Sequence, residues 1–201
     1  VAGVDHQFES KGRPFKLVGE LYYKDLDNLI PYEIENVRQR YYATNNSRGY
    51  ATGLDVMLNG EFIPGVQSWL RASVLKTEED LLDDSYEEYY NAQGLRVIPG
   101  YHTGPFAQIT DTLTVYPGMI PRPADQRVSF SVLFQDEMPR NPDYKVLLSL
   151  FYGSGLPYGP PSDNRYDDVL RTPAYRRVDV GFSRLLFGDD AGKDGAISLE
   201  V

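Results

Sequence analysis

The segment 126–136 alternates between apolar and polar residues with little interruption. Along an extended chain one side carries Val128, Phe130, Val132 and Phe134, and the other carries Ser129, Ser131, Leu133 and Gln135. Because successive side chains of a strand point to opposite faces, this segment predicts a strand with one apolar face and one mostly polar face. A sheet of such strands forms either half of a soluble sandwich or the wall of a membrane barrel.

The same alternation recurs along the chain, and no stretch of comparable length has a helical period. Seven strands are predicted, at 15–33, 39–61, 67–77, 126–136, 144–152, 173–186 and 196–201. Period two over segments of this length is a strand signal. The sequence therefore predicts an all-β fold of antiparallel, up-and-down strands.

The connections between these strands are of two kinds. Short ones, rich in Pro, Gly, Asn and Asp, lie at 62–66, 139–143 and 188–195, whereas long ones lie near 78–125 and 153–172. Short turns at one end and long loops at the other are typical of outer-membrane barrels. A soluble domain rarely carries structureless loops of this length.

Composition excludes several other classes of protein. A net charge of −9 argues against a nucleic-acid partner, and the absence of cysteine rules out a disulfide framework. The sequence has no run of about 18 apolar residues, so it predicts no transmembrane helix. The 16 tyrosines suit strands and membrane interfaces. Since no signal peptide begins at Val1, we expect a mature form or a fragment of an exported protein.

A series of short segments resembles the barrel of TonB-dependent outer-membrane receptors, and the resemblance runs from about Gly12 to Val201. The segments are 13–16, 20–24, 27–32, 49–55, 58–62, 68–70, 75–80, 120–128, 152–161, 175–179 and 197–201. Their order and spacing together carry the resemblance. Receptors of this family have a barrel of about 22 strands, with an N-terminal plug inside it and a TonB box ahead of the plug.

The resemblance implies that residues 1–201 are one partial barrel domain of about seven strands, roughly strands 15 to 21 of the family's barrel. The loops near 78–125 and 153–172 would then be extracellular, on a Gram-negative outer membrane. The intact receptor would bind a nutrient and import it with energy relayed by TonB. By this resemblance, residues 1–201 would lack the plug, the TonB box, the earlier strands and the final strand, and residues 91–119 would be an insertion.

The partners follow from the same resemblance. They are the TonB complex, reached through the missing N-terminal part, the plug domain, outer-membrane lipids, an unidentified nutrient ligand and, as in one branch of the family, a surface lipoprotein. An isolated segment of this kind would expose its apolar wall and its open strand edges, and we expect it to self-associate or to need detergent.

Aromatic residues in the longest loop are the candidates for ligand binding. They are Tyr86, Tyr89, Tyr90, Tyr101, Phe106 and Tyr116. Exposed aromatics hold ligands in receptors, but the same side chains could fold the loop upon itself. The acidic run at 78–90 is either a solvated loop or a cation-binding lip. Alternation also predicts that four residues face the barrel lumen: Arg71, Lys76, Arg177 and Asp179.

Catalysis has little support in the sequence. His6 and His102 are the only histidines, and neither has a partner at a ligand or catalytic spacing. We therefore expect no enzyme activity, no metal and no cofactor. Two alternatives remain. A soluble β-sandwich that binds carbohydrate would have short, evenly spaced strands. A hydrolytic outer-membrane barrel would need a His and Ser pair near the aromatic girdle at the membrane interface.

Overall fold

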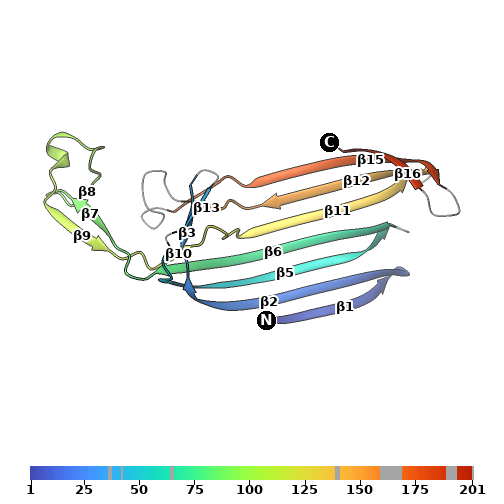
Figure 1. Ribbon diagram of the computed structural model, residues 1–201, viewed down its shortest axis with the longest axis horizontal. Helices are drawn as coiled ribbons and strands as arrows, with labels where there is room; N and C mark the ends of the chain where they lie inside the picture. The colour runs from blue at the N-terminus through green and yellow to red at the C-terminus, as the bar shows by residue number, and fades with distance from the viewer. Residues whose placement is uncertain are drawn as a thin grey trace.

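The computed structural model describes residues 1–35, 38–41, 43–63, 66–138, 141–158, 169–188 and 194–200. These residues form an all-β structure dominated by one antiparallel sheet. Eight strands follow one another along its path in chain order (Figure 1). They are β1 (Ala2–Ser10), β2 (Arg13–Leu29), β5 (Ser47–Ile63), β6 (Val66–Leu81), β11 (Val128–Met138), β12 (Asn141–Gly153), β15 (Tyr175–Gly188) and β16 (Asp194–Glu200).

The pairing register joins the apolar sides of these strands into one continuous face. Leu54 of β5 lies opposite Leu21 of β2 and Val74 of β6. Farther along the sheet, Leu150 of β12 lies opposite Val132 of β11 and Val178 of β15. Directly opposed residues share a face of the sheet. We call this surface the apolar face and the opposite surface the polar face.

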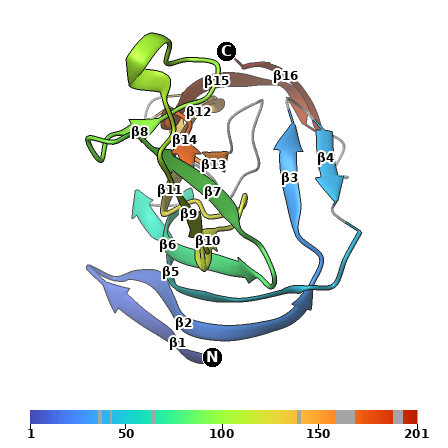
Figure 2. The same ribbon diagram turned by 90° about the vertical axis from the view of Figure 1, so that its left-hand side faces the viewer.

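The sheet is curved, and no second sheet covers its apolar face in the part of the chain that the structure describes. Figure 2 shows the sheet following an arc from β1 to β16. On the apolar face, Val74 is 55% exposed, Val178 is 60% exposed and Val128 is 42% exposed. Among the described residues, the buried large aliphatic side chains are those of Leu81, Val97 and Ile120, which lie at or beyond one end of the sheet. The sheet therefore encloses no sandwich-type core.

The two ends of the sheet differ, as the connection lengths predict. At one end, β1 and β2 are joined by the two-residue turn Lys11–Gly12, in which both φ angles are positive, 53° and 72°. This geometry suits the right-handed twist of a hairpin. The tips of the other three short turns, at 64–65, 139–140 and 189–193, lie outside the described residues.

The opposite end, which we call the loop end, carries the small elements (Figure 1). They are β3 (Tyr32–Glu35) with β4 (Arg38–Tyr41), β10 (Met119–Pro121), which pairs with β6, β13 (Pro157–Tyr158) with β14 (Leu170–Arg171), and a three-stranded sheet of β7 (Tyr86–Tyr90), β8 (Arg96–Val97) and β9 (Asp111–Val115). The 3-10 helix η1 (Gly104–Ala107) lies between β8 and β9. No helix in the described ranges is long and apolar enough to cross a membrane.

Three expectations about the strands need correction. The predicted strands 15–33 and 39–61 are each interrupted, at 30–31 and at 43–46, and β3 and β4 form a separate small hairpin. The sheet has an additional strand, β1, because residues 2–10 pair along their whole length with β2. Its alternation is masked in the sequence by polar residues such as His6 on the apolar side. The segment near 78–125 is also more ordered than a plain loop, since β6 continues to Leu81 and β7 to β10 follow. In the second long loop, residues 159–168 lie outside the described part.

Candidate functional site

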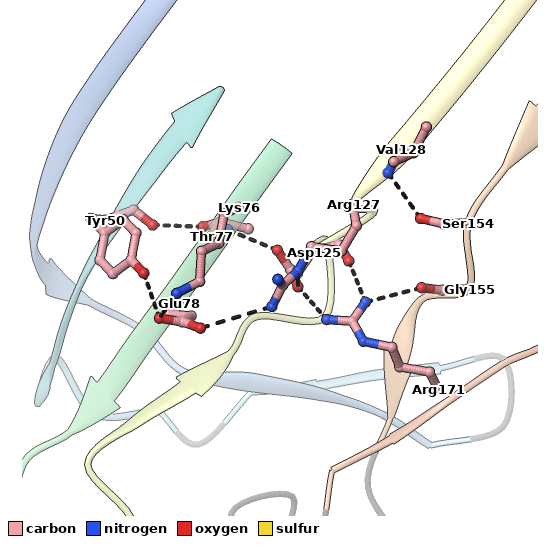
Figure 3. A network of polar contacts seen from close by, with 10 residues as sticks. All are labelled: Tyr50, Lys76, Thr77, Glu78, Asp125, Arg127, Val128, Ser154, Gly155 and Arg171. Atoms are coloured by element: carbon pink, nitrogen blue, oxygen red, sulfur yellow. Dashed lines mark hydrogen bonds and ion pairs between the residues drawn. The ribbon is translucent and has the colours of Figure 1, made fainter. Parts of the chain in front are cut away.

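A network of charged side chains holds the loop end together, and Asp125 lies at its centre (Figure 3). The Asp125 side chain is fully buried. Its Oδ1 accepts a hydrogen bond of 2.8 Å from the backbone N–H of Thr77 in β6. Its Oδ2 accepts a second one of 2.6 Å from Nε of Arg127. A buried carboxylate needs several such donors to offset the loss of its hydration.

Arg171 of β14 completes the shell around Asp125. Its Nη2 donates to Oδ2 of Asp125, and its Nη1 donates to the carbonyl of Asp125 at 2.9 Å and to that of Gly155 at 3.1 Å. One guanidinium thus ties together β14, the segment before β11 and the segment after β12. We call the group of Thr77, Asp125, Arg127, Gly155 and Arg171 the Asp125 cluster.

The hydrogen bonds decide the ionisation of Asp125. Burial alone would raise the pKa of this carboxyl group, but the hydrogen bonds from Arg127, the Thr77 N–H and Arg171 outweigh burial and hold the pKa below its ordinary value. Asp125 is therefore charged at neutral pH, and the cluster acts as a fixed ionic tie between loops.

A second polar group adjoins the Asp125 cluster on β5 and β6. The Tyr50 hydroxyl donates to Glu78, and Nζ of Lys76 lies 3.0 Å from Oε2 of Glu78 and 5.6 Å from the centre of the Tyr50 ring. Arg127 links the two groups, since its Nη2 lies 3.8 Å from Oε1 of Glu78. The loop end therefore has a continuous network of polar contacts from Tyr50 of β5 to Arg171 of β14 (Figure 3).

A third contact fastens β10 to β6. The side chain of Glu79 is fully buried, and its Oε2 accepts a hydrogen bond of 3.2 Å from Nε of Arg122. The backbone N–H of Arg122 donates to the carbonyl of Thr77 at 3.1 Å. The short connection between β10 and β11 is thus held at both ends by an arginine and a buried carboxylate.

The first three aromatic candidates lie on one strand but on two faces. Tyr86 and Tyr90 share one face of β7, and Tyr89 lies on the other. The hydroxyls of Tyr89 and Tyr90 donate to Glu87 and Glu88 at 2.8 and 2.6 Å. These hydrogen bonds to carboxylates raise the pKa of both tyrosines, so both phenols are neutral at neutral pH.

The structure brings Tyr101 and Phe106 together around His102. The ring centre of His102 lies 5.1 Å from that of Tyr101 and 4.8 Å from that of Phe106, in edge-on geometry. The backbone N–H of Ile98 donates to Nδ1 of His102 at 2.9 Å, which fixes the turn. The histidine is thus a partner of two predicted aromatic residues, and its position in a Gly-rich loop gave no sign of this. Tyr116 follows β9 and is 74% exposed.

The polar face carries a hollow of about 410 Å³ between β2, β5, β6, β11 and β12. Its lining includes Glu20, Asp55, Arg71, Ser131 and Phe151. Glu20 and Asp55 lie directly opposite each other across β2 and β5, and the Ser73 hydroxyl donates to Asp55. Charges of both signs therefore meet here beside an aromatic ring.

Three of the four residues expected on the lumen side share the polar face. Arg71 lies opposite Ser131 of β11, Arg177 lies opposite Phe151 of β12, and Asp179 lies opposite Ser149. Arg177 and Asp179 also form an ion pair of 2.8 Å between Nε and Oδ1.

Lys76 lies on the other face, so its expected grouping with Arg71 is corrected. The β5–β6 ladder is regular between Met57↔Arg71 and Thr52↔Lys76. Because Arg71 and Lys76 are five residues apart on an uninterrupted strand, their side chains must point to opposite faces.

Sequence reasoning did not find Asp125 or Arg171. Asp125 follows a Pro-rich stretch, and its partners Thr77 and Arg171 lie 48 and 46 residues away along the chain. No local spacing signals such a contact. Within the described ranges, no group of three His, Cys, Asp or Glu side chains could hold a metal ion.

Comparison of the chain with protein-family models, with curated proteins and with solved structures finds no match.

Proposed function

We propose that this chain forms part of the wall and mouth of a TonB-dependent outer-membrane receptor, which binds a nutrient and imports it. The observation that carries the proposal is the apolar face. It extends across the eight strands of the main sheet, it curves, and no sheet covers it among the described residues. In water so much uncovered apolar surface would be unfavourable, whereas in a bilayer it is the surface that lipid solvates.

The height of the apolar face fits the proposal. On β2 it extends over the nine residues 15–23, where Phe15, Leu17, Gly19, Leu21 and Tyr23 share the face. Nine residues span about 30 Å along a strand and about 23 Å across the membrane at a tilt of about 40°. The apolar band of outer-membrane barrels is about 25 Å tall.

Aromatic side chains bound this band at both ends. At the turn end, Phe15 of β2 packs against Phe8 of β1 at 5.5 Å and against Phe62 of β5 at 5.3 Å between ring centres. At the loop end, Tyr23 stacks on Tyr50 at 6.1 Å. Aromatic residues in two belts are favoured where apolar and aqueous regions meet.

The polar face and the loop end supply the rest of the proposal. The hollow lined by Glu20, Asp55 and Arg71 would face the barrel lumen, where the plug domain would meet it. The aromatic loop residues would face outward to the ligand. A soluble carbohydrate-binding sandwich needs a second sheet against Val128, Phe130 and Val132, and the described residues provide none. Neither catalysis nor a cofactor is part of the proposal.

Two experiments on the full-length protein test the proposal. A cysteine placed at Tyr101, in a full-length background in which any other cysteine is replaced, should react with a membrane-impermeant maleimide in intact cells; residues 1–201 contain no cysteine. Nutrient uptake should require both this protein and TonB. The control is a cysteine at Leu150, which should stay unlabelled in intact cells. If Tyr101→Cys is labelled only after lysis, or if uptake persists without TonB, the proposal fails.

A further inference from the structure

The strands β7, β8 and β9, with η1, form a separate body beyond the loop end, which we call the arm (residues 86–115). In Figure 1 the arm stands apart from the main sheet and is turned away from the direction of β6. The connection between the arm and the sheet consists of two chain segments, one that leaves β6 and one that enters β10.

The hydrogen-bonded ladder breaks between the sheet and the arm. On the sheet side, Asp80 lies opposite Met119, and on the arm side Tyr86 lies opposite Val115. Five residues, 81–85, therefore separate the ladders on one segment, and three residues, 116–118, separate them on the other. Since a regular antiparallel ladder keeps the same spacing on both strands, the pairing is interrupted and its register changes between the sheet and the arm.

Both segments also leave the extended conformation at this point. Asp83 has a φ of +67° and Gly118 has a φ of +65°. Left-handed φ values end the regular strand, and Asp and Gly are among the residues that adopt them most easily. The break is thus encoded on both segments.

The sheet side of the break is held firmly. Leu81 and Ile120 are buried, Glu79 is paired with Arg122, and the Asp125 cluster fixes the segment that follows. Leu82 is also tied down, because its backbone N–H donates to the carbonyl of Asn46 at 2.7 Å. The residues between the two bodies are therefore 83–85 and 116–118, which we call the pivot.

The arm has its own internal structure. Val97 is 2% exposed and Asn91 is 3% exposed. Oδ1 of Asn91 accepts hydrogen bonds from the N–H groups of Gln93 and Leu95 at 3.1 and 3.0 Å, and its Nδ2 donates to the carbonyl of Phe106 at 3.3 Å. One buried amide thus joins the turn between β7 and β8 to η1.

From these observations we infer that the arm turns as a rigid body about the pivot. Two ordered bodies joined by two short, non-extended segments form a hinge, in which a few residues absorb the change in φ and ψ. The motion carries five of the predicted aromatic residues together, Tyr86, Tyr89, Tyr90, Tyr101 and Phe106. The hinge rests on the geometry alone, whereas its use in capturing a ligand at the mouth rests on the proposed function.

Electron–electron distance measurements on the full chain in detergent test the hinge. Spin labels on Leu95→Cys in the arm and Leu54→Cys in the sheet report the distance across the pivot. The matched control pairs are Leu95→Cys with Leu113→Cys inside the arm, and Leu54→Cys with Val178→Cys inside the sheet. These four side chains are all exposed, with Leu95 at 51% and Leu54 at 45%.

The hinge predicts a distance distribution across the pivot at least about twice as broad as either control. A distribution across the pivot as narrow as the controls would overturn the hinge. A broad distribution inside the arm would overturn the rigid body. Neither distance measurement depends on nutrient uptake or on TonB. The hinge can therefore fail while the proposed function stands, and the proposed function can fail while the hinge stands.

Discussion

Arg171 donates to the buried carboxylate of Asp125 from 46 residues farther along the chain, and the same guanidinium binds the carbonyl of Gly155. This contact couples the two long loops of the protein, because Asp125 belongs to the first and Arg171 to the second. It fastens the two loops to each other at a place where few apolar side chains are buried.

Replacing Asp125 with asparagine should lower the free energy of unfolding by about 2 kcal/mol, because two arginines lose their buried anion. This loss of unfolding free energy is smaller than the loss expected for a fully buried ion pair, since Arg127 and Arg171 are partly exposed. The matched control is Arg48→Gln, which removes the ion pair of a mostly exposed arginine with Asp80 and should cost less than about 1 kcal/mol. Denaturant unfolding in detergent measures both, and equal effects would contradict the structural role of Asp125.

The same variant should reveal the pH dependence of the cluster. Because the folded pKa of Asp125 is lowered, its stabilising contribution is fully present above the ordinary carboxyl pKa of about 3.9 and is lost as the pH falls from there through the folded value. The stability difference between wild type and Asp125→Asn should stay constant from about pH 7 to about pH 5 and shrink below about pH 4. A difference that already shrinks between pH 8 and pH 6 would show that another group controls the cluster.

Removing the other partner should loosen the second loop locally. The N–H of Thr172 donates to the Leu156 carbonyl at 2.9 Å, and the N–H of Leu156 donates to the Thr172 hydroxyl at 3.0 Å. In Arg171→Gln these two amides should exchange hydrogen about ten times faster. Amides of β7 serve as the internal control and should keep their rates; a uniform acceleration would indicate global destabilisation instead.

A side chain at Gly53 should clash with its neighbours. A Cβ atom there would lie 2.4 Å from the Tyr22 hydroxyl oxygen and 2.6 Å from the Val74 carbonyl oxygen. Gly53→Ala should therefore destabilise the sheet by about 1–3 kcal/mol. Gly19→Ala is the control, since its Cβ would meet no atom within 4 Å. Adding Tyr22→Ala should recover part of the loss, because the Val74 carbonyl remains. Full tolerance of Gly53→Ala in thermal unfolding would contradict the packing.

A pair of neighbouring substitutions distinguishes the two faces of β12. Leu150→Arg places a cation on the apolar face, between Val132 and Val178, and should cost about 2–4 kcal/mol in a bilayer. Ser149→Arg places the same side chain opposite Asp179 on the polar face and should cost less than about 1 kcal/mol. Folding into lipid vesicles, measured by unfolding with denaturant, gives both values, and equal costs would contradict a lipid-facing side.

Much of the sheet could be predicted from the sequence, because alternation is a local property. Leu150 and Ser149 fall on the predicted faces, and the order of strands follows from hairpins joined in sequence. Strand β1 was missed because His6 interrupts its apolar side, and Lys76 was assigned to the wrong face although its distance from Arg71 along the strand is an odd number of residues.

The candidate site could be predicted only in part. Ligand binding by the aromatic residues of the arm stays a prediction. The sequence did not indicate that Tyr89 faces away from Tyr90 or that His102 joins Tyr101 to Phe106. No local sequence pattern indicates the role of Asp125, since this role depends on partners that the sheet and β14 bring together. Such contacts are set by tertiary structure, and local propensity does not encode them.

The measurement that tests the central claim most directly is the accessibility of spin labels to oxygen and to a nickel complex in lipid bilayers. Labels at Leu54→Cys, Leu150→Cys and Val178→Cys on the apolar face should collide with oxygen, which dissolves in lipid. A label at Ser73→Cys on the polar face should instead collide with the aqueous nickel complex. If the labels on the apolar face are shielded from both reagents, they lie in a protein core, and the account of this sheet as a membrane wall is wrong.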